Sequence, residues 1–421
     1  MFDASEHHGG ALAGLKVIDL SRVLAGPLCT QMLADNGADV IKVEPPLGDE
    51  TRTLGPPFAD DGNAAYFGSV NRGKRAITLD LTQPGAHDVL FALLQDADVL
   101  VENFLPGTMR RWGLDYDTIL APRFPRLVYC TISGFGEDGP LGGLPGYDAI
   151  LQAMCGLMSI NGENTSGPTR IGIPIVDHLT GYTAMTAILM AIVERSRSGR
   201  GQRVEATLFN TALSLLVPHA ANWLASGQAP RQMGSAHPNI APYDKFNCRD
   251  GQIFLGILND RQFGRFCEHL GLHDVLADPR YAHNADRLAH RDALRVAIEA
   301  ALAGRSRQTL CKELMALGVP AGPVNSVPEA FEQPHAAGML VQRDGYRGVG
   351  LPNRLYRTPG QPGGNPPGFA QHTDEVLQQA GLSAVAIAHL RESGVLPGST
   401  QSCDAVVSDL QQANNSTGRR S

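Results

Sequence analysis

Residues 16–44 read KVIDLSRVLAGPLCTQMLADNGADVIKVE, and this stretch decides the fold class. Its two ends, 16–20 and 39–44, are short apolar runs typical of buried strands, whereas 27–36 has the pattern of a helix that opens on a proline. The alternation continues with strands at 76–81, 98–102 and 127–132 and a helix at 84–94. Strands that alternate with such helices predict βαβ units and a parallel sheet covered on both faces. We therefore expect an α/β fold.

The rest of the chain predicts a second, smaller domain. A strand at 204–206 leads into one long helix at 208–224, and the region from 246 onward reads as a strand pair followed by short helices such as 261–270 and 291–303. Residues 324–368 are rich in Pro and Gly, and a helical end follows at 373–395. The predicted organisation is a large domain in 1–205, a linker helix in 206–230, a small α+β domain in 231–325, a return to the large domain in 326–396, and a disordered tail in 397–421.

Composition favours an enzyme of small-molecule chemistry. The chain has 421 residues, of which 43% are apolar and only 18% charged, with a net charge of −7. These values indicate neither a nucleic-acid footprint nor a membrane-surface patch. Residues 1–10 lack the apolar core of a signal peptide, and no apolar run approaches the ~20 residues of a membrane span. Seven cysteines without a Cys-x-x-Cys pair predict a reducing, cytoplasmic location.

Several familiar motifs are absent or incomplete. Residues 134–139 match G-x-G-x-x-G after a predicted strand, but Pro140 follows and no helix opens there, so we expect a tight loop over a pocket and no dinucleotide site. There is no G-x-S-x-G elbow, which excludes the usual hydrolase nucleophile. The histidines form no H-E-x-x-H motif, and we expect no metal. Cys29 and Cys155 lie in apolar helical contexts typical of core thiols.

Asp177 is the lead catalytic candidate. It lies in the run GIPIVDHLTG at 172–181, at the end of a strand-like apolar stretch and just before a small-residue helix at 181–192. An acid in this position either caps the helix or presents a nucleophilic carboxylate. A second candidate is the run NRGKR at 71–75, whose three cations indicate either a phosphate site or a solvated turn.

Four blocks of sequence, in order and with consistent spacing over about residues 14–395, resemble the class III CoA-transferase family, which also contains α-methylacyl-CoA racemase. The blocks are GLKVIDLSRVLAGP at 14–27, GADVIKVE at 37–44, VENFLPG at 101–107, and GYD at 146–148 together with 172–181 and GRGQ at 199–202. The resemblance implies an interlocked homodimer. Each chain would thread through the other, with a Rossmann-like large domain built from both chain ends.

The resemblance also implies that Asp177 attacks the thioester of an acyl-CoA and passes through acyl-anhydride and CoA-thioester intermediates. An Asp with an ordinary pKa near ~3.9 would need no base for this step. The CoA thioester is then a substrate, and no permanently bound cofactor is expected. Carried over position by position, the expected contacts of the CoA are Leu24, Ala25, Leu79, Asp80, Leu81, Thr82, Asn103, Phe104, Leu105, Arg111, Tyr147 and Asp148.

This chain departs from the family pattern at two charged positions. Pro45 stands where related enzymes have an Arg, and Pro145 stands where they have a Lys. The expected replacement for this phosphate-binding charge is the cation run, Arg72, Lys74 or Arg75. The oxyanions of the reaction need aimed N–H donors, and the loops at 134–143 and 234–241 are the candidates.

Tyr147 separates the transferases from the racemases. Racemases of the family place a His 30 residues before the Asp, and this chain has Tyr147 there. A Tyr with a pKa near ~10 is a poor base for an α-proton at neutral pH, whereas a His near ~6.5 is well matched. We therefore favour a transferase over the alternatives, a racemase or a CoA-binding protein without turnover.

The acceptor acid is the least determined feature. The stretches 235–243 and 49–52 look most like enzymes that move CoA from succinyl-CoA to dicarboxylates such as glutarate, itaconate or mesaconate. A dicarboxylate needs a cation for its distal carboxylate, and Arg52, Arg170 and His237 are the candidates.

Overall fold

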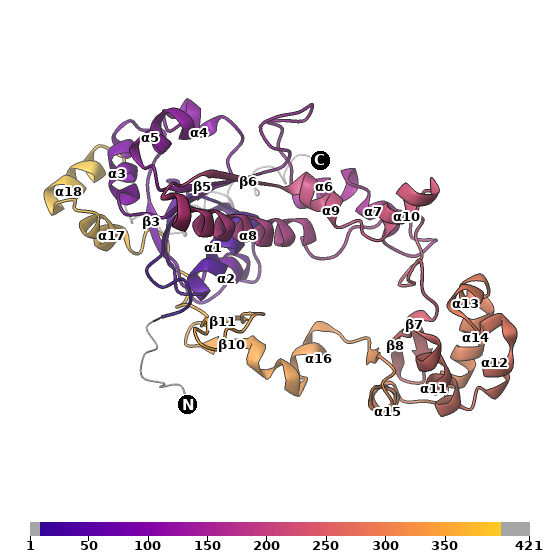
Figure 1. The fold of residues 1–421 in the computed structure, drawn as a ribbon. Helices are drawn as coiled ribbons and strands as arrows, with labels where there is room; N and C mark the ends of the chain where they lie inside the picture. Colours follow the sequence, from indigo (N-terminus) through magenta and orange to yellow (C-terminus); the bar gives the residue numbers. More distant parts are fainter. Residues whose placement is uncertain (1–8, 397–421) are drawn as a thin grey trace, which may run out of the picture. The chain divides into compact units, whose positions relative to one another are not determined.

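The computed structural model describes residues 9–396, and the predicted tail at 397–421 lies outside them. The described residues form two compact units. The first contains 9–151, 173–214 and 338–396, and the second contains 152–172 and 215–337. Segments from both ends of the chain therefore belong to the first unit (Figure 1).

The first unit is built on a six-stranded sheet in which all paired strands run parallel. Ile18 in the first strand lies between Ile41 and Leu100 of its two neighbours. The strand order is β3-β2-β1-β4-β5-β6, which is that of the doubly wound Rossmann fold. The strands are β1 (Lys16–Asp19), β2 (Asp39–Glu44), β3 (Arg75–Thr78), β4 (Val99–Glu102), β5 (Val128–Ser133) and β6 (Arg203–Thr207). The predicted α/β class is confirmed.

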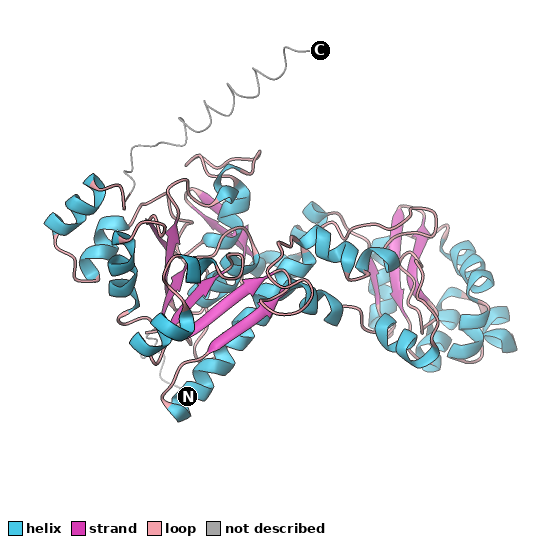
Figure 2. Cartoon of the chain, turned by 90° about the horizontal axis from the view of Figure 1, so that it is seen from above, coloured by secondary structure: helices cyan, strands magenta, loops and turns pink. Residues whose placement is uncertain are grey.

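Helices cover both faces of this sheet (Figures 1 and 2). On one face α3 packs with α17 and α18, so that Val376, Leu377 and Ile387 from the chain end join a core begun at Ile18. On the other face α1 and α8 pack together. The helices of this unit are α1 (Ala25–Asp35), α2 (Ala65–Asn71), α3 (Gly85–Leu94), α4 (Thr108–Arg111), α5 (Ala121–Arg123), α8 (Ile175–Ser198), α9 (Leu208–Ser214), α17 (Thr373–Gln379) and α18 (Ala384–Glu392), with α6 (Asp148–Met154) at its boundary.

Short elements complete the first unit. They are the 3₁₀ turn η1 (Glu50–Thr53), the π-helical turn η2 (Tyr116–Leu120) and the hairpin β10 (Leu340–Arg343) and β11 (Tyr346–Val349). The hairpin packs on α2, and α17 packs on β3. The returning chain is thus part of the layer structure that begins at the N-terminal strands.

Helix α8 approaches α1 closely because of a glycine. A Cβ built on Gly181 would lie 2.8 Å from the carbonyl oxygen of Ala25, so a larger residue there would push the two helices apart. Among the described residues α8 is the one helix long and apolar enough to cross a membrane by length and composition alone. The sequence analysis expects no such run. The helix packs against α1, β5 and β6 with part of its surface, and 33% of its apolar window is buried.

The predicted long helix at 208–224 is wrong in one respect. The structure has two helices there, α9 (Leu208–Ser214) and α10 (His219–Ser226), with Pro218 directly before the second. A proline has no N–H to donate and its ring clashes with the preceding turn, so a helix begins at or after it and does not run through it. In the division into units, α9 belongs to the first and α10 to the second.

The second unit has an α+β architecture, as predicted. Its three-stranded antiparallel sheet has the order β7-β8-β9, and a core around Ile253, Phe266 and Leu294 joins the sheet to the helices. The elements are β7 (Tyr243–Cys248), β8 (Gly251–Gly256), β9 (Ala321–Pro323), α7 (Leu157–Ile160), α11 (Asp260–Leu270), α12 (His273–Ala277), η3 (Pro279–Tyr281), α13 (Asn284–Ala289), α14 (Arg291–Leu302), α15 (Arg307–Ala316), α16 (Val327–Phe331) and η4 (Pro334–Met339).

Candidate active site

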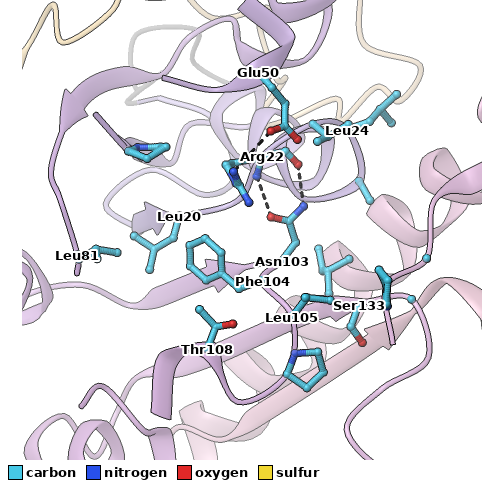
Figure 3. Close-up of a pocket in the computed structure, with 18 of the residues that line it drawn as sticks. Leu20, Arg22, Leu24, Glu50, Leu81, Asn103, Phe104, Leu105, Thr108 and Ser133 are labelled. Carbon is cyan, nitrogen blue, oxygen red and sulfur yellow. Dashed lines mark hydrogen bonds and ion pairs between the residues drawn. The ribbon is translucent and has the colours of Figure 1, made fainter. Parts of the chain in front are cut away.

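The main cavity of the first unit lies where a doubly wound sheet binds its ligands. After β1 the chain turns to β2 on one side, and β4 lies on the other side, so the loops that leave these two neighbouring strands diverge and open a crevice. The cavity has a volume of about 540 Å³. Eleven of the predicted residues line it: Leu24, Ala25, Leu79, Asp80, Leu81, Thr82, Asn103, Phe104, Leu105, Tyr147 and Asp177. Figure 3 shows several of them around the loops after β1 and β4.

Asp177 lies in the first turn of α8. The helix begins at Ile175, directly after Pro174, so the expected strand-like stretch before Asp177 is wrong. A proline before the first helical residue gives the helix a fixed entry. The carboxylate thus stands at a helix N-terminus and lines the cavity.

The ionisation of Asp177 also differs from the prediction. Burial in the cavity wall raises the pKa of this carboxyl to about 7, and the negative charge of Asp148 adds to the shift. The dipole of a helix N-terminus favours a carboxylate, but here the loss of hydration outweighs it. The carboxyl of Asp177 therefore titrates near neutral pH, which makes its reactivity sensitive to pH.

Asp148 holds the start of α8 in place. Its Oδ2 accepts hydrogen bonds from the backbone N–H groups of Val176 at 2.7 Å and Asp177 at 3.2 Å. The side chain is 6% exposed and is not among the described residues that line the cavity. These contacts give Asp148 the role of a distant helix cap and argue against the direct CoA contact that we expected.

Arg72 and Lys74 do not face the cavity. Arg72 binds both carboxylate oxygens of Asp35, at 2.9 and 2.6 Å, and Lys74 Nζ lies 2.9 Å from Oδ2 of Asp19. Lys74 Nζ also donates to two further oxygens, and both cations are only 3% exposed. The N–H groups of both side chains bind buried carboxylates, which argues against the predicted role in phosphate binding.

Arg75 and Arg111 also have other contacts. Arg75 binds both oxygens of Asp39 and stands at the first residue of β3, whereas the cavity lies at the opposite ends of the strands. Arg111 is exposed and donates to Thr108 Oγ1 at 2.7 Å, and it does not line the cavity in the described part of the chain.

The three residues predicted to bind the distal carboxylate of the acceptor lie in different environments. Arg52 is buried, binds both carboxylate oxygens of Glu44 and stacks on the ring of Phe67, with its guanidinium carbon 3.8 Å from the ring centroid. That environment leaves it no open face toward a ligand. Arg170 and His237 belong to the second unit, where Arg170 is exposed.

The sequence analysis missed Arg22, which also lines the cavity. Arg22 directly follows Ser21 in the loop that leaves β1, and the carboxyl end of the first strand is where a doubly wound fold places ligand contacts. Its place directly after the first strand could therefore have identified Arg22 from the sequence. The end of β5 contributes Ser133, and the loop after it contributes Gly134, as expected for a glycine-rich loop over a pocket.

Two further features bear on cofactors. Across residues 9–396, no group of three or more His, Cys, Asp or Glu side chains is placed to hold a metal ion. Cys29 and Cys155 are both buried. Burial raises the pKa of the Cys29 thiol, which makes it an inert core group, as predicted.

Comparison with known proteins confirms the resemblance seen in the sequence blocks. The model of CoA-transferase family III matches residues 12–373. A succinate–glutarate CoA-transferase of Agrobacterium fabrum is 42% identical over 83% of this chain and 88% of that protein. An acetyl-CoA:oxalate CoA-transferase of Acetobacter aceti is 40% identical over 82% of this chain and 89% of its own length. The crystal structure of a CaiB/BaiF family protein from Brucella suis is 40% identical, covers 89% of this chain and 100% of that one, and superposes with a TM-score of 0.80. The chain therefore belongs to CoA-transferase family III and is a CoA-transferase.

Proposed function

We propose that this enzyme moves coenzyme A from succinyl-CoA to a dicarboxylic acid, with Asp177 as the nucleophile. The observation that carries the proposal is the position of the Asp177 carboxylate in the wall of the switch-point cavity. Two relatives with about 40% identity act, by their names, on the dicarboxylates glutarate and oxalate. A dicarboxylate acceptor is the chemistry that these relatives share.

The reaction divides into exchanges at one carboxylate. An oxygen of Asp177 attacks the thioester carbonyl, the C–S bond breaks, and CoA leaves as a thiolate. The thiolate then attacks the aspartyl carbonyl of the mixed anhydride and releases the donor acid, which leaves Asp177 as a CoA thioester. The acceptor carboxylate repeats these two steps in reverse and restores Asp177. Each step exchanges one acyl bond for another without net uptake of a proton.

The role of Asp148 in this cycle is to position the nucleophile. By accepting from the N–H groups of Val176 and Asp177, it fixes the first turn of α8 and hence the direction of the Asp177 side chain. Tyr147, the residue before Asp148, lines the cavity and is 67% exposed. We assign it a contact with the bound acyl-CoA. The cycle needs no cofactor beyond the CoA thioester.

The direct test follows label from succinyl-CoA into a panel of dicarboxylic acids by mass spectrometry, with acetyl-CoA and oxalate as a second donor and acceptor. We expect transfer without net hydrolysis, and loss of transfer in Asp177→Ala. The exposed Asp60→Ala serves as the matched control and keeps full activity. Peptide mapping after hydroxylamine treatment during turnover should find modification at position 177. Full turnover by Asp177→Ala would refute the mechanism.

The racemase alternative predicts a different product. A racemase removes the α-proton of a 2-methylacyl-CoA and would incorporate deuterium from solvent. This chain has Tyr147 at the position where the racemases of the family have a His. We therefore expect no deuterium uptake, and uptake would favour the racemase. Binding of CoA with no transfer to any acceptor would favour a CoA-binding protein without turnover.

We further propose that the enzyme is a cytoplasmic, interlocked homodimer, as the family resemblance implies. Support comes from α8, where Met190 is 67% and Val193 55% exposed beside a shallow apolar hollow. Exposed apolar patches of this kind mark interaction surfaces. Light scattering after size-exclusion chromatography should give the mass of two chains, and Met190→Asp should shift the mass toward one chain.

A further inference from the structure

The cavity that takes the acyl-CoA is short of positive charge. Among the described residues that line it, Arg22 is the one Arg or Lys, while Glu50, Asp80 and Asp177 are acids. A CoA thioester carries several phosphate charges, and phosphates are bound in proteins chiefly by Arg and Lys. The cations at 72–75 are held elsewhere by carboxylates. Charge complementarity therefore points to Arg22.

The guanidinium of Arg22 is only loosely engaged. Its Nη1 lies 3.5 Å from Oε2 of Glu50, beyond a normal hydrogen bond, and both side chains are more than a third exposed. Its Nε is buried and has no hydrogen-bond partner among residues 9–396. The guanidinium carbon lies 5.8 Å from the centroid of the Phe104 ring, another wall of the cavity. Figure 3 shows Arg22 between Glu50 and Phe104. An anion in the cavity would satisfy donors that the protein leaves unused.

The backbone at Arg22 is held rigidly, although its side chain is not. Asn103, on the loop after β4, accepts from the Arg22 N–H at 2.8 Å and donates to the Arg22 carbonyl at 2.7 Å (Figure 3). The next residue, Val23, has φ of +69°, a strained conformation for a β-branched residue. Such strain persists where surrounding contacts determine the backbone, and it clusters at ligand sites. The loop is therefore preformed to present the Arg22 side chain.

We infer that Arg22 binds a phosphate group of the acyl-CoA, and that Glu50 competes with this phosphate for the guanidinium. The inference rests on the proposed CoA-transferase reaction and adds the residue that recognises the nucleotide end of the donor. It replaces the phosphate role expected for Arg72, Lys74 and Arg75.

The test compares two donors that differ only in the nucleotide. Arg22→Gln should raise the KM for succinyl-CoA by about tenfold or more, the size expected for the loss of one charge-assisted hydrogen bond, with little change in kcat. The KM for succinyl-pantetheine, which has no phosphate, should not change. Succinyl-dephospho-CoA separates the 3′-phosphate from the diphosphate. Glu50→Gln is the matched variant and should lower the KM for succinyl-CoA by a few fold.

Two outcomes of the kinetic test overturn the inference. An equal rise in KM for both donors would mean that Arg22 only supports the cavity wall. A rise in the KM for the acceptor acid, with the donor unaffected, would assign Arg22 to a carboxylate. Direct calorimetric binding of CoA to wild type and Arg22→Gln tests the contact without turnover. If CoA binds more weakly to Arg22→Gln than to the wild type, but the wild type transfers no CoA, the Arg22 contact stands. Only the proposed reaction is then rejected. Equal melting temperatures of the two proteins serve as the folding control.

Discussion

The carboxylate of Asp148 lies within hydrogen-bond distance of the backbone N–H of Asp177, at 3.2 Å, and of the N–H of Val176, at 2.7 Å. One carboxylate thus holds the helix turn that carries another. The pair has an electrostatic consequence as well, because the charge of Asp148 adds to the burial that raises the pKa of Asp177 to about 7. The same residue fixes the nucleophile and restrains its ionisation.

Replacing Asp148 by Asn should separate these two effects. The amide oxygen of Asn still accepts from the N–H of Val176, but the negative charge is gone, so the pKa of Asp177 falls. Because Asp177 reacts as the carboxylate, kcat/KM for the acyl-CoA should rise with pH across about pH 7 in the wild type. In the variant we expect this rise at a pH lower by about half a unit or more. A pH profile measured from pH 5 to 9 checks this.

Asp148→Ala is the companion variant. It removes the charge and the cap together, so the maximal rate should also fall, since the first turn of α8 loses its acceptor. A profile of Asp148→Asn that coincides with the wild type would show that the Asp148 charge does not reach Asp177.

Asp177→Asn should stabilise the fold in alkaline solution. The pKa of Asp177 in the folded state is about 7, above the ordinary value of 3.8, so the folded state holds a proton that the unfolded chain loses. Stability from this group is therefore present in acid and lost as pH rises toward 7. We expect the substitution to raise the free energy of unfolding by about 1 to 3 kcal/mol more at pH 8 than at pH 5. Urea unfolding at both pH values measures it, with the exposed Asp60→Asn as control. An equal gain at both pH values would contradict the raised pKa.

Gly181→Ala should destabilise the protein although alanine favours helices. The added Cβ would lie 2.8 Å from the Ala25 carbonyl oxygen and 3.4 Å from Leu28 Cδ2, so α1 and α8 must separate. We expect a loss of about 1 to 3 kcal/mol, as for overpacked cores. Gly304→Ala is the control, because its Cβ meets no atom within 4 Å. Chemical denaturation of both variants tests this, and equal stability of the two would show that α1 and α8 tolerate a wider spacing.

Lys42→Met should be costly because it isolates a buried carboxylate. Lys42 Nζ lies 2.9 Å from both Asp49 Oδ2 and the carbonyl oxygen of Ser21, and both side chains of the ion pair are fully buried. Removing one partner of such a pair costs about 3 to 5 kcal/mol. Lys42→Met combined with Asp49→Asn should cost less than the sum of the two single variants, which a double-mutant cycle measures.

The control for this prediction is Lys16, which forms an ion pair with Asp96. The side chain of Asp96 is 71% exposed. Lys16→Met should cost at most about 1 kcal/mol, because water screens an exposed pair. Similar losses for Lys16→Met and Lys42→Met would contradict the buried character of the Lys42 pair.

The sequence by itself determined the layer structure and the outline of the cavity. Apolar runs such as 16–20 and 39–44 became neighbouring parallel strands because their period and length allow little else. The loops after the strands at 16–20 and 98–102, with Leu24, Asn103 and Phe104, reached the cavity because the carboxyl ends of parallel strands share one edge of the sheet.

Only the tertiary structure decided which charged groups face the ligand and in what state. The sequence shows Arg72 and Lys74 as a basic run, but whether a cation meets a phosphate or a buried carboxylate depends on partners distant in the chain, here Asp35 and Asp19. The pKa of Asp177 follows the same logic, because burial and a neighbouring charge are properties of the folded surroundings. The hydrophobic periodicity of a strand or helix is local and can be read from the sequence. The charge state and ion-pair partners of a side chain depend on contacts that only folding creates.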